Sequence, residues 1–181
     1  RETLGDHAAA LADHQAALAA ARAAGDRAAE WQALIDLGVV WTARDYARAR
    51  PCFEEALALA RALGEPSLVA RSLNRIGNWL TNAGRPAEGV PLHDEALSAC
   101  EAAADRAGLA ETLDLLGLAV GHAGDLPRAI ACYARAAELY RALDDRMGLV
   151  AALVILAQIG APSFSSPIAL PRGGITSIVR A

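Results

Sequence analysis

A block of about 40 residues recurs along the chain, and this repeat limits the possible folds more than any other feature. Three segments share the pattern Leu-x-x-[Leu/Ile]-Gly, at residues 34–38, 73–77 and 113–117. The second half of the block repeats as well, in the alanines that occupy one position of each copy: Ala56, Ala96 and Ala136. A period in this range is typical of stacked supersecondary units, which favours a binding surface over a catalytic pocket.

Each block divides into two helices. Within residues 106–145, Leu109, Leu113 and Leu116 have the spacing of one helix face, and Gly124-Asp125 then interrupts the pattern. The predicted helices are about 7–24, then the pairs 27–43 with 46–63, 66–83 with 86–103 and 106–123 with 126–143, and finally about 147–160. The corresponding units are a partial one at 1–25, repeats at 26–65, 66–105 and 106–145, and a last helix at 146–160. We expect a turn at Leu4-Gly5-Asp6.

Small residues recur where the paired helices must approach each other. We expect the glycine of each first helix to face a small residue of the second, in the pairs Gly38 with Ala49, Gly77 with Gly89, and Gly117 with Ala129. A glycine inside a helix costs about 1 kcal/mol relative to alanine, so its recurrence indicates a packing requirement.

These positions resemble the tetratricopeptide repeat over residues 4–160. The family pattern appears in the first copy as Leu34, Leu37-Gly38, Trp41, Ala49, Phe53 and Ala56, and the other two copies agree with it. The resemblance implies an all-α, right-handed solenoid of antiparallel helix pairs that binds proteins or peptides. The long period is similar to the variety found in the C-terminal arms of large bacterial regulatory ATPases and transcriptional regulators.

Composition and charge exclude several other functions. The net charge of −4 argues against a nucleic-acid-binding surface, and no segment is long enough to span a membrane comfortably. The three cysteines form no metal-binding pattern and are typical of a reduced, cytoplasmic protein. No catalytic constellation stands out, because the histidines are scattered and His93 occupies a packing position shared with Phe53 and Tyr133. We therefore expect no enzyme activity, no cofactor and no metal.

The candidate binding residues lie on the first helix of the middle repeat. Asn74, Asn78 and Asn82 follow one another at intervals of four, and Arg71 and Arg75 accompany them. Amide side chains both donate and accept hydrogen bonds, so a column of them can hold an extended peptide backbone. The alternative is that Asn82 ends the helix and the other two are solvated. Aromatic anchors are the other candidates: Trp79 and Trp31 for partner contact, with Trp41 assigned to packing.

The C-terminal region differs from the repeats. The helix predicted at 147–160 is apolar on all sides. Residues 161–181 contain three prolines and Gly173-Gly174, which predicts an irregular tail or the edge of a truncated or diverged repeat. We expect that helix to be covered by the tail, through Phe164, Ile168 and Leu170, or by another chain.

The sequence thus predicts a protein- or peptide-binding scaffold. Its expected role is the sensing or interaction arm of a larger intracellular signalling or transcription-regulatory protein. The alternative is self-association through residues 147–160, and an enzyme is the third and weakest hypothesis.

Overall fold

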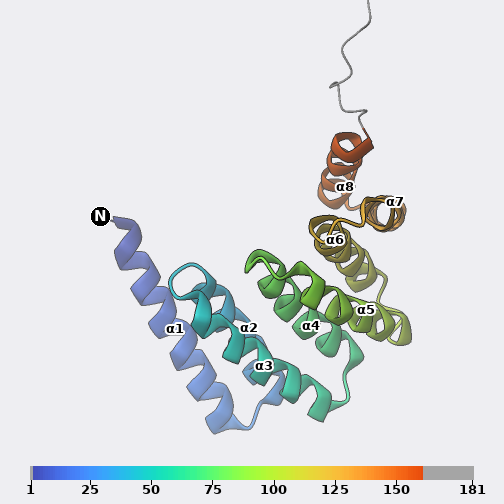
Figure 1. Ribbon diagram of the computed structural model, residues 1–181. Coiled ribbons are helices and arrows are strands. Elements are labelled where there is room, and N and C mark those ends of the chain that lie inside the picture. The colour runs from blue at the N-terminus through green and yellow to red at the C-terminus, as the bar shows by residue number, and fades with distance from the viewer. Residues whose placement is uncertain (1, 161–181) are drawn as a thin grey trace, which may run out of the picture.

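The computed structural model describes residues 2–160, which form eight helices and no strand (Figure 1). The helices are α1 (Glu2–Ala24), α2 (Arg27–Thr42), α3 (Tyr46–Leu63), α4 (Pro66–Asn82), α5 (Pro86–Ala102), α6 (Arg106–His122), α7 (Leu126–Ala142) and α8 (Arg146–Gly160). Each helix packs against the next one in the chain, and α4 also packs against α6 (Figure 1). The all-α helical repeat predicted from the sequence is confirmed.

Local signals explain where the helices begin and end. The carboxylates of Asp26, Asp105 and Asp125 each accept a hydrogen bond from the backbone N–H three residues later, which caps α2, α6 and α7. Proline stands in the first turn of α4, α5 and α7, where it has no hydrogen bond to lose. Gly64 ends α3 with a φ of 71°, a conformation that glycine adopts without strain.

The prediction for the N-terminal segment is wrong. The first helix begins at Glu2, so Leu4-Gly5-Asp6 lies inside a helix and not in a turn. One helical glycine costs about 1 kcal/mol, and the alanine-rich sequence that follows has the highest helix propensity and outweighs it.

The repeated glycine of each first helix lies against a ring of the second helix. The pairs are Gly38 with Phe53, Gly77 with His93, and Gly117 with Tyr133. A Cβ atom at Gly117 would lie 2.9 Å from Cε2 of Tyr133, which is closer than real side chains approach. The ring therefore requires glycine at this position, because any other residue would collide with it.

The small residues that the sequence placed opposite these glycines, Ala49, Gly89 and Ala129, are all buried. In the middle repeat the close approach of the two helices is direct, because a Cβ at Gly89 would lie 2.6 Å from the carbonyl oxygen of Gly77. Ala49 and Ala129 are fully buried, but the ring is what comes closest to Gly38 and Gly117. A buried ring projects farther across the interface than an alanine, so it reaches the opposite backbone first.

Two further predictions concern the C-terminal part and the membrane. The tail predicted at 161–181 lies outside the described residues. Of the helices that the structure describes, none combines the length and apolar character needed to cross a membrane.

Candidate functional site

A groove of about 130 Å³ opens between α2, the start of α3 and α4. Its lining residues are Val39, Thr42, Tyr46, Phe53, Arg75, Asn78, Trp79 and Asn82. We call it the α2–α4 groove. It brings together four of the six residues that the sequence singled out, namely Arg75, Asn78, Trp79 and Asn82.

An aromatic pair forms one wall of the α2–α4 groove. The rings of Tyr46 and Trp79 stack with their centroids 5.2 Å apart and their planes at 14°. Two hydrogen bonds fix the pair: the Tyr46 hydroxyl donates to the Trp79 carbonyl at 2.7 Å, and the Trp79 indole N–H donates to the Tyr46 carbonyl at 2.9 Å. The guanidinium of Arg50 lies 5.4 Å from the centroid of the Trp79 ring. The stacked rings therefore form a flat wall whose geometry is held by two hydrogen bonds.

Burial also affects the chemistry of this wall. Desolvation raises the pKa of Tyr46, while a hydrogen bond to Asn82 acts in the opposite direction. The phenol therefore stays neutral and keeps its proton for the hydrogen bond to α4. The sequence analysis missed Tyr46, because its partner on α4 is 33 residues away and nothing local connects the two.

Two asparagine amides lie on the α4 side of the groove. Asn78 is half-buried and Asn82 is exposed, and the Asn82 amide N–H donates to the Asn78 amide oxygen at 3.4 Å. This contact and the Asn82 contact with Tyr46 leave part of the hydrogen-bonding capacity of both amides unused.

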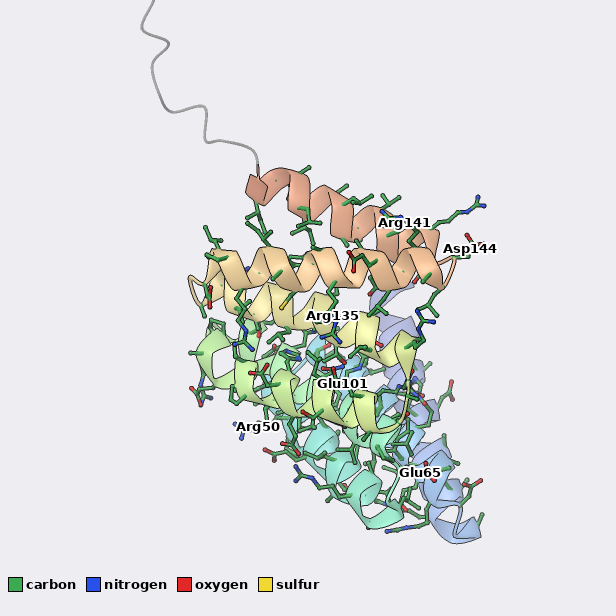
Figure 2. All side chains as sticks on the ribbon, turned by 90° about the vertical axis from the view of Figure 1, so that its right-hand side faces the viewer. Arg50, Glu65, Glu101, Arg135, Arg141 and Asp144 are labelled. Atoms are coloured by element: carbon green, nitrogen blue, oxygen red, sulfur yellow. The ribbon has the colours of Figure 1, made fainter. Side chains whose placement is uncertain are left out.

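The groove also contains a positive charge without an internal counter-charge. Among the side chains of residues 9–160, Arg75 and Arg71 have no ion-pair partner. Some arginines on the second helices pair with the neighbouring repeat, as Arg135 of α7 does with Glu101 of α5 at 3.2 Å (Figure 2). Arg75 is therefore a guanidinium at the groove without a carboxylate partner among these residues.

Arg71 does not line the α2–α4 groove. Its guanidinium lies 4.7 Å from the centroid of the Trp31 ring and borders a second, larger pocket of about 720 Å³. That pocket is also lined by acidic residues, including Asp105, Glu111 and Asp145. Asp105 and Asp145 cap the starts of α6 and α8 by accepting hydrogen bonds from Gly108 and Gly148. Arg71 is thus placed beside the proposed site and not in it.

The prediction is wrong for Asn74. Its side chain is only 3% exposed, its amide N–H donates to Thr112 Oγ1 at 2.8 Å, and its amide oxygen lies 2.9 Å from His93 Nδ1. Residues four apart on a helix are separated by about 400°, so each step turns the side chain by about 40° and the third residue lies about 80° from the first. The asparagine column therefore cannot face one direction, and Asn74 points into the contact between α4, α5 and α6.

The structure also places the tryptophans and His93. Trp31 is 2% exposed and donates its indole N–H to Ser72 Oγ at 2.8 Å, so it is a packing residue and does not contact a partner. Trp41 packs against the core while remaining half-buried. His93 is fully buried, which confirms its packing assignment. Burial lowers the pKa of His93 to about 4, so its imidazole is neutral at pH 7.

The fold and the groove define a helical repeat protein with an open, partly polar groove. A family model described as tetratricopeptide repeat matches residues 68–159, and the chain belongs to this family. No curated protein sequence matches the chain.

Solved structures share the fold at low sequence identity. BtubC (BKLC) from P. vanneervenii is 19% identical, with 100% of this chain and 83% of that one covered and a TM-score of 0.66. The TPR domain of Arabidopsis FLU is 20% identical, with 66% and 98% covered and a TM-score of 0.57. A Rap protein complexed with competence and sporulation factor is 18% identical, with 87% and 48% covered and a TM-score of 0.61.

Proposed function

We propose that the chain is a protein-binding module whose α2–α4 groove holds an extended peptide that carries a carboxylate. The observation that carries this proposal is the unpaired guanidinium of Arg75, placed in the groove beside the amides of Asn78 and Asn82. A guanidinium forms two parallel hydrogen bonds with a carboxylate, which gives both affinity and orientation.

The other groove residues support the same ligand. The amides of Asn78 and Asn82 can donate to and accept from a peptide backbone whatever its side chains are. The flat ring of Trp79 and the side chain of Val39, which is 44% exposed, offer an apolar surface next to the charge. The Rap protein with a similar fold was solved in complex with competence and sporulation factor, which supports a binding role for this architecture.

The module's wider role is the sensing or interaction arm of a larger intracellular signalling or transcription-regulatory protein. This part of the proposal rests on the resemblance of its long repeats to the arms of bacterial regulatory ATPases. An ATPase or DNA-binding domain in the same natural polypeptide would support this role. A polypeptide with neither domain would contradict it.

The binding proposal is tested by a substitution in the groove. The 181-residue protein is screened against an array of short synthetic peptides, and its best ligand is measured by calorimetry. Asn78→Ala removes a donor and an acceptor from a partly desolvated groove, so we expect binding to weaken by about 1–3 kcal/mol with little change in folding. Glu95→Ala, on the exposed surface of α5, is the control and should leave affinity unchanged.

The charge requirement is tested separately. A copy of the same peptide with each acidic residue replaced by its amide should bind the parent protein more weakly, and Arg75→Gln should abolish that difference. Equal affinities of the parent and Asn78→Ala would move the binding site away from this groove. A peptide that binds equally well in both forms would remove the carboxylate from the proposal.

A further inference from the structure

The surface of α8 exposes large apolar side chains. Met147 is 82% exposed, Val150 58%, Leu153 44% and Val154 49%. The opposite side of the helix packs against α7, through residues such as Ile155, Leu156 and Ile159. Both sides of the helix are apolar, but only one of them packs against another helix. The other apolar face has no partner among the described residues.

The repeat register shows what normally covers this face. Leu153 stands 40 residues after Leu113, in register with Leu34 and Leu73. Those three leucines are only 3%, 1% and 0% exposed, whereas Leu153 is 44% exposed. In the unit of α6 and α7, Gly117 lies one helical turn after Leu113 and packs against Tyr133 of α7, so the second helix covers this side of the first one. Val150 stands likewise 40 residues after Ala110, which is 0% exposed, so Val150 and Leu153 belong to a surface that is covered in the preceding complete unit.

The sequence after α8 retains the beginning of such a second helix. Residues 167–169 read Pro-Ile-Ala and lie 40 residues after Pro127-Arg128-Ala129, which opens α7. Ala169 also falls in register with Ala49 and Gly89, the small residues at which a second helix enters its unit. This match ends at Pro171 and Gly173-Gly174, because proline and glycine are the residues least compatible with the interior of a helix.

We propose that residues 161–181 fold back along α8 and cover Val150 and Leu153. This segment starts directly after Gly160, at the end of α8. The helix has 15 residues and a length of about 22 Å, while 21 extended residues reach about 70 Å, so the segment can return along the whole helix.

The composition of the segment suits this position. It supplies apolar side chains along its length, at Phe164, Ile168, Leu170, Ile175, Ile178 and Val179. It contains no acidic residue, so covering an apolar surface would bury no carboxylate. The attachment to α8 also raises the local concentration of the segment far above that of any separate chain.

The proposal is tested by the accessibility of a cysteine on the α8 face. Leu153→Cys is introduced into the 181-residue chain, and its rate of alkylation is followed by peptide mass spectrometry, which distinguishes it from the three native cysteines. A second protein carries the same cysteine together with Ile168→Ser, Leu170→Ser, Ile175→Ser and Ile178→Ser. Ala87→Cys, at an exposed position of α5, reports any general change in reactivity.

We expect the cysteine at position 153 to be alkylated about tenfold more slowly in the protein with the natural segment than in the protein with the four serines. A tenfold ratio corresponds to a segment that covers the cysteine about ten times as often as it leaves it exposed. Ala87→Cys should react equally in both. Equal rates at position 153 would overturn the proposal. Protection that disappears on dilution, together with a doubled mass in sedimentation, would also overturn it and assign the face to a second copy.

Discussion

The contact between Gly117 and Tyr133 makes a sharp prediction for helix packing. Gly117→Ala adds one methyl group at the centre of α6. That methyl group would lie 2.9 Å, 3.0 Å and 3.1 Å from three ring atoms of Tyr133. The Tyr133 ring is only 2% exposed, so it cannot swing into solvent to make room.

Two opposing effects set the magnitude. Alanine is a better helix former than glycine, which stabilises the variant by about 1 kcal/mol. Ordinary contact begins near 3.4 Å, so the ring or the helix must move by about 0.5 Å, and overpacking of this kind costs about 1–3 kcal/mol. We therefore expect Gly117→Ala to be destabilised by a net amount of up to about 2 kcal/mol.

A matched control lies one helical turn away. A Cβ atom at Gly121 would lie 3.5 Å from Cβ of Ala129, an ordinary contact, so Gly121→Ala has the propensity gain without the collision. The two variants should differ by about 1–3 kcal/mol, and this difference is nearly independent of helix propensity. Urea denaturation followed by far-UV circular dichroism measures it.

A double substitution isolates the collision. In a Tyr133→Ala background the ring is gone, and Gly117→Ala should become stabilising by up to about 1 kcal/mol. If Gly117→Ala stabilises the parent protein as much as Gly121→Ala does, the ring does not require glycine and this account of the repeated glycine is refuted.

Two further predictions concern titration and surface charge. Burial lowers the pKa of His93 from 6.5 to about 4. Between these pH values the unfolded chain therefore binds a proton that the folded chain does not. The free energy of unfolding should fall by up to about 3 kcal/mol as the pH drops through this window. His93→Phe, which copies Phe53 in the first repeat, should flatten this part of the stability profile relative to the parent, and an unchanged slope would show that other groups cause it. Arg135→Ala breaks the exposed pair with Glu101 and should cost less than about 1 kcal/mol in urea denaturation, whereas a larger loss would mean that this pair supports the stacking of repeats.

The sequence was sufficient to predict the helices and the family because both depend on a repeated pattern. Apolar spacing, the aspartate caps and the prolines act over one or two turns, and three copies of the repeat gave the same result. The assignment of His93 to packing succeeded for the same reason, since Phe53 and Tyr133 occupy the equivalent positions. These predictions required no knowledge of how one repeat lies against the next.

The candidate site was only partly predictable because its geometry depends on contacts between repeats. Asn74 looked equivalent to Asn78 and Asn82 in the sequence, but its partner Thr112 is 38 residues away. Trp31 likewise pairs with Ser72, 41 residues away, and that hydrogen bond places it in the core. Spacing along one helix indicates which residues are neighbours, whereas burial depends on which helix arrives opposite them.

The buried position of Asn74 helps to explain why Asn78 and Asn82 face the groove. Asn74 joins α4 to two of the helices packed against it, to α6 through Thr112 and to α5 through His93, and Thr112 donates in turn to the Gly108 carbonyl. Such a network is fully favourable only at one rotation of α4, because a buried amide that loses its partners costs about 1–3 kcal/mol. With that rotation fixed, the next two asparagines are turned by about 40° and 80°, away from the core and towards the open side. Asn74 is buried and cannot contact a ligand in the groove, but it orients Asn78 and Asn82, the two asparagines that we propose as ligand contacts.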